Sequence, residues 1–251
     1  MSRTLVLTVN VLGLGPEATE APEAELFGRF AHGRYTYNIG MARLLDFLAA
    51  RGQTATFFWP ATEAARMPDM IRRCAAEGHE IAAMGWGFED HATLQPAAEI
   101  DLLTRAHALL EHLSGQTPIG FRAPTLTLSH ATLPMLKGLG YRYDSSFLDD
   151  DQPYPLDEFG AAGMTELPYA EGLHDETHFG QRIAQPRAER FFEETLDGLM
   201  DATGWGCMSL TPRGDMGVGR LARLAMVGRI LDRARDQGAR IVPARVALDT
   251  V

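Results

Sequence analysis

The sequence predicts a single α/β domain spanning residues 1–251, with a mostly parallel, barrel-like sheet ringed by helices. Short apolar segments rich in β-branched and aromatic residues alternate along the chain with longer segments of helical periodicity. Neither an internal repeat nor a linker interrupts this alternation. The chain has 251 residues, of which 45% are hydrophobic and 22% charged, and this suffices for one large core.

The expected strands are short apolar runs that end at Gly, Pro or polar clusters: residues 5–11, 55–59, 81–84, 120–124, 141–146, 164–167, 207–210 and 240–242. The first run is almost continuously apolar, as in a strand buried on both faces. Helical spacing predicts helices at residues 40–50, 68–77, 96–114, 129–139, 187–202 and 218–237. Ser129 is the expected N-cap of the helix that it starts. Residues 16–26 and 28–37 are expected to be loops, the second dense in aromatic residues, Arg and His.

The composition excludes several classes of function. The net charge of −10 argues against nucleic acid or an anionic membrane as a partner, because no basic face is supplied. No apolar stretch is long enough for a leader peptide or a membrane span, so a cytoplasmic location is expected. Cys74 and Cys207 lie in separate apolar runs, and two buried free thiols are a better expectation than a disulfide, which stays possible.

Residues 78–91 hold the densest group of candidate functional residues. A short apolar strand ends there at two glycines that flank Trp86, and Phe88, Glu89, Asp90 and His91 follow. Titratable and aromatic side chains just beyond the carboxyl end of a strand occupy the edge where α/β folds usually place their chemistry. A functional site is therefore expected at this edge.

This stretch resembles the second signature of the polysaccharide deacetylase family, Gly-His-Glu-Ile-x-x-His-Gly-x-x-His-Glu. The positions that fit are Gly78, His79, Glu80, Ile81, Gly85 and Glu89. Further segments resemble the family's other motifs in order: 7–10, 55–58, the Arg motif at 120–124, the Asp-Ser-Ser strand at 143–146, and 210–212. The resemblance covers the whole chain and implies the family's irregular (β/α)7–8 barrel. The aromatic loop and the Phe-Glu-Asp-His variant are similar to the branch of cyclic-imide and allantoin-type hydrolases.

The sequence departs from the family at the positions that carry its reaction. In the family, paired Asp residues end the first strand, two His residues bind a divalent metal and a His near the last Pro is the general acid. Here the first strand ends Asn10-Val11-Leu12, the His positions hold Met84 and Phe88, and the acid position holds Thr211. A thioether and a phenyl ring do not hold Zn²⁺ or a harder ion, and Asn and Thr supply neither base nor acid. No metal and no other cofactor is therefore expected.

Candidate catalytic groups are the remaining polar residues of these motifs: Arg122, Glu89, Asp90 and His91. Arg122 could bind a carbonyl oxygen or a carboxylate through parallel hydrogen bonds, or could form a structural ion pair. His91 could act as a base with Glu89 or Asp90, or bond to the backbone at the barrel rim. The candidate ligand-binding residues are Asn10, His32, Arg34, Met84, Trp86, Phe88, Thr211 and Arg213.

The family's motifs are present while its reactive positions are substituted, and three functional hypotheses follow. The preferred one is a pseudo-deacetylase that binds a small amide- or imide-like ligand, or that supports an active paralogue in a hetero-oligomer. The second is a metal-independent hydrolase of a small amide or cyclic imide that uses Arg122 together with residues 89–91. The third, an active metal enzyme, requires relocated ligands from Glu89, Asp90, His91, Asp149 and Asp150. Metal analysis and a substrate panel separate them.

Overall fold

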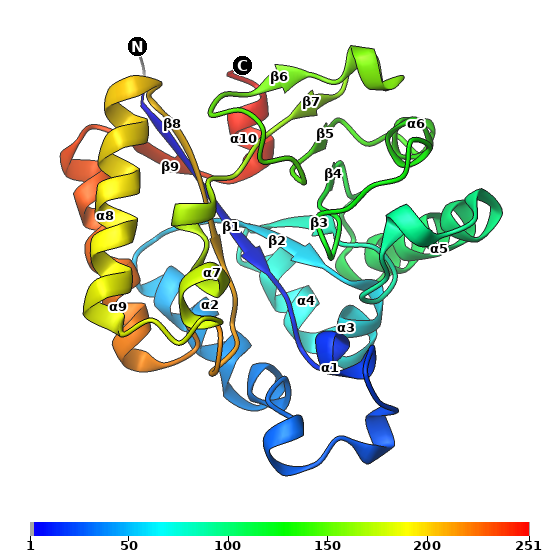
Figure 1. The fold of residues 1–251 in the computed structure, drawn as a ribbon, viewed down its shortest axis with the longest axis horizontal. Helices are drawn as coiled ribbons and strands as arrows, with labels where there is room; N and C mark the ends of the chain where they lie inside the picture. Colours follow the sequence, from blue (N-terminus) through cyan, green and yellow to red (C-terminus); the bar gives the residue numbers. More distant parts are fainter. Residues whose placement is uncertain (1–2, 251) are drawn as a thin grey trace.

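The computed structural model describes residues 3–250, and within them a sheet of nine strands curls into an open half-barrel (Figure 1). Its strand order is β6-β7-β5-β4-β3-β2-β1-β8. The ninth strand, β9, lies off this path and pairs with the first half of β1. The strands are β1 (Thr4–Asn10), β2 (Thr56–Trp59), β3 (Glu80–Ala83), β4 (Gly120–Phe121), β5 (Tyr143–Asp144), β6 (Tyr154–Pro155), β7 (Thr165–Glu166), β8 (Trp205–Leu210) and β9 (Arg240–Val242). All pairings are parallel except β6 with β7. The predicted irregular α/β barrel is thus confirmed.

Helices cover the outside of the curled sheet, as the alternation predicts (Figure 1). They are α1 (Gly15–Ala18), α2 (Met41–Ala50), α3 (Ala61–Arg66), α4 (Pro68–Ala76), α5 (Pro96–Ser114), α6 (Thr132–Gly138), α7 (Asp175–Phe179), α8 (Gln185–Ala202), α9 (Leu221–Asp236) and α10 (Ala244–Leu248). Five 3₁₀ turns occur at Glu23–Glu25, Gly28–Phe30, His91–Thr93, Asp157–Phe159 and Glu171–Leu173, and a π-helical turn at Thr36–Gly40 leads into α2.

Most predicted boundaries are confirmed to within a few residues, but the predictions for Ser129 and for the two loops are wrong. The helix at 96–114 has the predicted ends, because Gly115 adopts φ 70° and ends it in the left-handed conformation. Ser129 is not an N-cap: α6 begins at Thr132, and the Ser129 hydroxyl instead donates to Oε2 of Glu99. The segment 16–26 is not wholly a loop, since α1 lies across its start and a 3₁₀ turn lies within it. The segment 28–37 is not wholly a loop either, since it begins with a 3₁₀ turn and ends in the π-helical turn.

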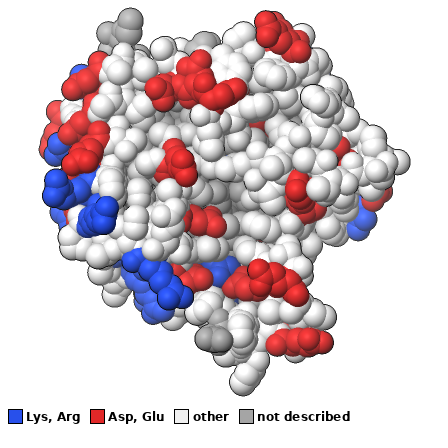
Figure 2. All heavy atoms as spheres, in the orientation of Figure 1, with Lys and Arg blue, Asp and Glu red and all other residues white. Residues whose placement is uncertain are grey.

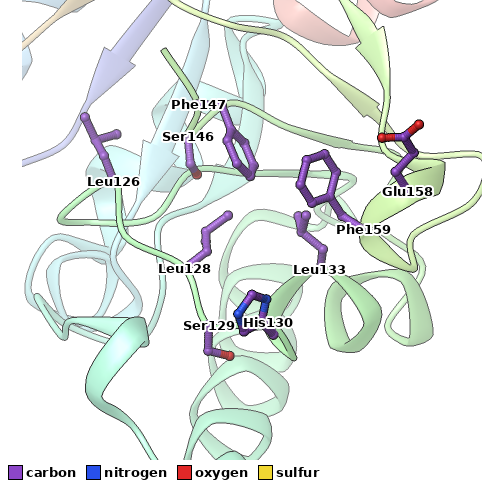
Figure 3. A pocket seen from close by; sticks show the side chains of 9 residues that line it. All are labelled: Leu126, Leu128, Ser129, His130, Leu133, Ser146, Phe147, Glu158 and Phe159. Atoms are coloured by element: carbon purple, nitrogen blue, oxygen red, sulfur yellow. The ribbon is translucent and has the colours of Figure 1, made fainter. Parts of the chain in front are cut away.

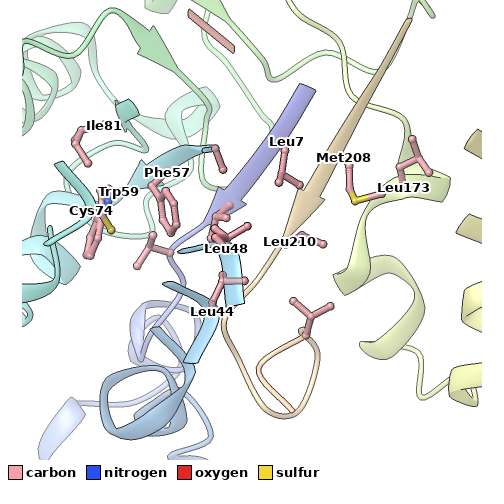
Figure 4. Packing of buried hydrophobic residues seen from close by; sticks show 14 of the residues in the cluster. Leu7, Leu44, Leu48, Phe57, Trp59, Cys74, Ile81, Leu173, Met208 and Leu210 are labelled. Atoms are coloured by element: carbon pink, nitrogen blue, oxygen red, sulfur yellow. The ribbon is translucent and has the colours of Figure 1, made fainter. Parts of the chain in front are cut away.

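The hydrophobic core lies between the sheet and the helices that cover it (Figure 4). Every residue of β1 is buried, and its partners β2 and β8 are buried along their whole length. Leu7 faces this core with Phe57 of β2, Met208 of β8 and Leu44 of α2. A strand buried on both faces needs a continuous apolar run, which explains the composition of the first strand.

Both cysteines are buried free thiols, as predicted. Burial raises the pKa of Cys74 and that of Cys207, which keeps both sulfurs protonated. Among the described helices, none combines the length and the apolar character that crossing a bilayer would require. Met1 and Ser2, which belong to the segment considered for a leader peptide, lie outside the described residues.

Candidate functional site

A pocket of about 360 Å³ opens at the carboxyl ends of the central strands. Its polar wall combines the end of β1 with the segment that follows β7, and its apolar wall follows β3 and β4. The lining residues are Asn10, Leu12, Met84, Phe88, Ala123, Pro124, Thr125, Leu126, Leu148, Tyr169, Glu171, His174, Glu176 and Thr177. This is the edge at which parallel α/β sheets place ligands. Three of the predicted ligand-binding residues, Asn10, Met84 and Phe88, meet here.

Arg122 lies beneath this pocket and is fully buried. Its guanidinium donates from Nε to the Ser145 carbonyl (2.9 Å) and from Nη1 to the Ser209 hydroxyl (2.9 Å). It is stacked between the rings of Phe58 and Tyr169, with Cζ 4.2 Å and 4.8 Å from the two centroids. No carboxylate forms a salt bridge with it among the described residues. The side chain therefore joins strands across the barrel interior instead of lining the pocket.

Two further bonds from Nη1 of Arg122 reach β1. They go to the hydroxyl of Thr8 (3.0 Å) and to Oδ1 of Asn10 (2.9 Å). The other terminal nitrogen donates to the Ser145 hydroxyl (2.7 Å) and contacts Sγ of Cys207 (3.8 Å). All nitrogens of the guanidinium thus have partners, and each partner is a neutral group.

Glu89, Asp90 and His91 hold their own loop together. Both carboxylate oxygens of Glu89 accept backbone N–H bonds, from Trp86 and Gly87, each 2.6 Å long. Oδ1 of Asp90 accepts from the N–H of Ala92 and caps the 3₁₀ turn that follows. A Cβ at Gly85, where φ is 69°, would lie 2.5 Å from Oε1 of Glu89, so this folded loop requires glycine there.

His91 is fully buried and points away from the pocket. Its Nδ1 lies 3.1 Å from Oε1 of Glu99, and its ring packs edge-on against Phe121 at 5.5 Å. Glu99 is itself buried and accepts from the hydroxyls of Ser129 and Thr132. The four predicted catalytic residues therefore do not converge on the pocket.

The other predicted ligand-binding residues lie outside the pocket as well. The hydroxyl and N–H of Thr211 both donate to the buried carboxyl of Asp175, at 3.0 Å and 2.7 Å. Arg213 pairs with Glu17 (2.6 Å) and Asp215 (2.8 Å). Trp86 packs under the guanidinium of Arg105, 4.2 Å from its ring centroid. His32 and Arg34 are exposed on the loop after β1.

The sequence prediction missed the polar groups that line the pocket most closely, His174, Glu171 and Glu176. Only 8% of His174 is exposed, and its Nε2 lies 3.7 Å from Oε2 of Glu176. Burial, with help from the charge of Arg122, lowers the pKa of His174 to about 3, and burial raises that of Glu176. The available signal was a cluster of titratable residues at 171–176, directly after the strand predicted at 164–167.

The pocket does not fit the divalent metal that the family resemblance implies. The two positions to which the resemblance assigns His ligands present a thioether and a phenyl ring, and the one oxygen of Asn10 is taken by Arg122. Within residues 3–250, no three His, Cys, Asp or Glu side chains are grouped as a metal site would need. Asp149 and Asp150, which a relocated site would need, are exposed and do not line the pocket.

A second pocket, of about 460 Å³, lies beside the first, and Leu126 lines both (Figure 3). Leu128, Leu133, Phe147 and Phe159 give it an apolar interior, and His130 and Glu158 lie at its border (Figure 3). Leu126 has φ 59°, a conformation that branched residues rarely adopt. The turn that carries Leu126 is thus held in a specific shape between two cavities.

Acidic side chains are scattered over the face that holds a central hollow, whereas Lys and Arg gather toward its lower left (Figure 2). This distribution agrees with the net charge of −10 and leaves no continuous basic surface on this face.

A family model described as polysaccharide deacetylase matches residues 35–143. The chain is similar to the peptidoglycan deacetylase-like protein FGM2 of Gibberella zeae, with 34% identity over 131 residues. That match covers 51% of this chain and 39% of the relative, so the chain aligns with less than half of the relative's length.

Solved structures match the whole fold. A proposed polysaccharide deacetylase from Mycobacterium smegmatis superposes with a TM-score of 0.91 and 27% identity, over 100% of this chain and 91% of that one. The allantoinase PuuE superposes with a TM-score of 0.82 and 22% identity, over 98% of this chain and 89% of that one, and it shows the shared fold. The similarity in fold therefore extends well beyond the matched segment.

Proposed function

The chain belongs to the polysaccharide deacetylase family, and from that premise we propose that it is a pseudo-deacetylase. In this proposal its barrel-mouth pocket binds a small amide- or imide-bearing ligand without the family's metal chemistry. One observation carries the proposal: Asn10, Met84 and Phe88, which stand where the resemblance places a base and two metal ligands, line one pocket. A cavity has been kept while its side chains suit contact and hydrogen bonding instead of a metal-bound water.

The polarity of the pocket supports a small neutral ligand. Met84, Phe88 and Leu12 supply apolar walls, and Asn10 and His174 supply neutral hydrogen-bonding groups. A volume of about 360 Å³ suits a small molecule or one sugar unit. The proposed location is the cytoplasm, where small molecules are the accessible ligands, and two buried free thiols are compatible with a reducing compartment.

The proposal includes a supporting role toward an active relative. A domain that keeps the barrel and binds the same class of ligand can pair with a catalytically intact paralogue in a hetero-oligomer. The partner would then carry the hydrolysis, and this chain would stabilise or regulate it. Co-purification from the native host, with the activity of the complex compared with that of the isolated partner, tests this part.

Metal-independent hydrolysis is the second candidate function, and the pair His174–Glu176 is the observation in its favour. An imidazole 3.7 Å from a carboxyl group and facing a pocket resembles an acid–base pair. The pKa of about 3, however, makes the imidazole a weak base at neutral pH. Arg122, Glu89, Asp90 and His91 are engaged in structural contacts, so this candidate needs the groups of residues 171–176 instead.

The experiment combines metal analysis with a substrate panel. Protein purified after growth with zinc, and then dialysed, is expected to contain far less than one equivalent of metal. It is expected to release no acetate from N-acetylated chitooligosaccharides and to open no cyclic imide, with or without added Zn²⁺. Binding without turnover supports the proposal. Turnover that resists a chelator would instead establish the second candidate, and stoichiometric metal with turnover would overturn both.

A further inference from the structure

The orientation of the Asn10 amide is fixed by Arg122. A guanidinium has donors only, so the atom of Asn10 that lies 2.9 Å from Nη1 must be the carbonyl oxygen. The NH₂ group of Asn10 is then turned away from Arg122. Among residues 3–250 no hydrogen bond from this NH₂ group is found, and the side chain lines the pocket. The pocket therefore offers a pre-oriented neutral donor.

His174 supplies the complementary group. Its Nε2 is shielded from solvent and lies 3.7 Å from Oε2 of Glu176, so a ligand atom does not reach it. Its Nδ1 makes no hydrogen bond within the described part of the chain and is not shielded in this way, so Nδ1 is the ring nitrogen that is available to a ligand in the pocket. The edge of the Tyr169 ring, with centroids 5.3 Å apart, holds the imidazole in place. The lowered pKa leaves the ring neutral near pH 7, so one ring nitrogen is a hydrogen-bond acceptor.

The groups that line the pocket disfavour an anionic ligand. Glu171 and Glu176 add two carboxyl groups, and the described lining residues include neither Lys nor Arg. An anionic oxygen placed at Nδ1 of His174 would face the lone pair of that nitrogen, in a pocket whose wall carries two carboxyl groups. The guanidinium of Arg122 beneath the pocket has neutral partners for all of its nitrogens and offers the ligand no donor.

We propose that Asn10 and His174 together recognise one amide group. The Asn10 NH₂ donates to the carbonyl oxygen of the ligand, and the ligand's N–H donates to Nδ1 of His174. This inference rests on the proposed ligand-binding function and deepens it, because it names the two contacts and the ligand class: an uncharged C(=O)–NH group, discriminated from the isosteric carboxylate. The contacts need His174 to be protonated at Nε2, the nitrogen that faces the carboxyl group of Glu176.

The test uses matched probes, acetamide against acetate and succinimide against succinate. Protein labelled with ¹³C in the methionine methyl groups reports binding in the pocket through Met84, assigned by comparison with Met84→Leu. Acetamide and succinimide are expected to shift the Met84 resonance in a saturable way, and the two anions to leave it unchanged at the same concentrations. His174→Leu is expected to lower the affinity for the neutral probes at least tenfold. His174→Gln, which keeps an acceptor, is expected to restore part of that affinity. His112→Leu, on the exposed face of α5, is the control and is expected to bind like the wild type.

The outcomes separate this inference from the proposed function. If neutral probes bind equally well to wild type and His174→Leu, ligand binding stands and the role of His174 is overturned. Equal affinity for acetamide and acetate overturns the selection against anions. If none of the probes shifts Met84, the proposed function fails and this inference falls with it. Imidazole ¹⁵N spectra give a measurement without any variant or ligand: His174 protonated at Nδ1 near pH 7 would contradict the proposed contact.

Discussion

Nη1 of Arg122 donates a 2.9 Å hydrogen bond to Oδ1 of Asn10, so a fully buried cation positions a side chain that lines the pocket. The same nitrogen also bonds to Thr8 and Ser209, on β1 and β8. One side chain thus links the barrel interior to the pocket floor. Substitutions of Arg122 are therefore expected to change the stability of the fold, and substitutions of Asn10 to change the affinity for the ligand.

Arg122→Met is expected to lower the free energy of unfolding by roughly 3 kcal/mol or more. The substitution removes every donor while the buried acceptors of Thr8, Ser145 and Ser209 stay in place. Arg122→Lys keeps the charge but lacks the planar fork, so an intermediate loss is expected. Urea unfolding measures both losses.

The matched control is Arg142→Met. Arg142 is exposed, and its single ion pair, to Asp249, is 3.4 Å long, so a change of less than about 0.5 kcal/mol is expected. An Arg122→Met protein as stable as the wild type but unable to bind or turn over ligand would show that the cation serves the pocket directly.

Asn10→Asp is expected to weaken amide binding at least tenfold, or about 1.4 kcal/mol, without destabilising the fold. The new carboxylate pairs with Arg122 as the amide oxygen does now, but it replaces the NH₂ donor with an acceptor. Titration with succinimide, followed through the Met84 methyl resonance, gives the affinity, and thermal unfolding gives the stability. Asn38→Asp, at an exposed position, serves as the control. An unchanged affinity in Asn10→Asp would contradict the proposed role of the NH₂ group as a hydrogen-bond donor to the ligand.

A triple variant, Asn10→Asp with Met84→His and Phe88→His, is expected to gain about one equivalent of zinc. All three positions line the same pocket, and a carboxylate with two imidazoles is a ligand set that Zn²⁺ accepts. Elemental analysis after dialysis measures the gain, and each single substitution is a control expected to bind little. If the triple variant folds and stays metal-free, the three side chains that line this pocket do not converge closely enough to hold one ion.

The barrel could be predicted because the local composition of a strand depends on how the strand is buried. A strand covered on both faces needs an unbroken apolar run, and residues 5–11 provide one. Short segments such as α3 and α7 escaped prediction because tertiary packing, not periodicity, holds a helix of one or two turns. The start of α6 was misplaced because Ser129 bonds to a residue thirty positions earlier, Glu99.

The site could be predicted only where the strand ends defined it. Asn10, Met84 and Phe88 each follow or end a predicted strand, and they meet in the pocket. His91 lies only three residues beyond Phe88, yet the tight loop at Gly85 turns its ring into the core toward Glu99. His174 belongs to an irregular segment after β7, whose path depends on long-range contacts such as its bridge to Ser209.

Asp144 and Glu166 form a buried carboxyl pair on the neighbouring strands β5 and β7. Burial raises the pKa of Asp144 to about 6, and burial together with the charge of Asp144 raises that of Glu166 well above its usual range. The folded protein therefore binds more protons here than the unfolded chain, whose carboxyl pKa values are about 4. The stability that Asp144 contributes is fully present below about pH 4 and is lost as the pH rises through 6, and the contribution of Glu166 is lost as the pH rises through its own raised pKa.

Glu166→Gln is therefore expected to gain stability relative to the wild type between pH 5 and pH 8, on the order of 1–2 kcal/mol. The substitution removes one titrating carboxyl, keeps an oxygen that can accept from the Phe147 N–H (3.1 Å in the wild type), and offers Asp144 a donor. Urea unfolding of both proteins at the two pH values measures the difference. Glu158→Gln, at an exposed position, controls for the loss of one negative charge and is expected to follow the wild type. Parallel pH dependence of wild type and Glu166→Gln would mean that the pair is already ionised in the folded protein, against the raised pKa values that burial produces.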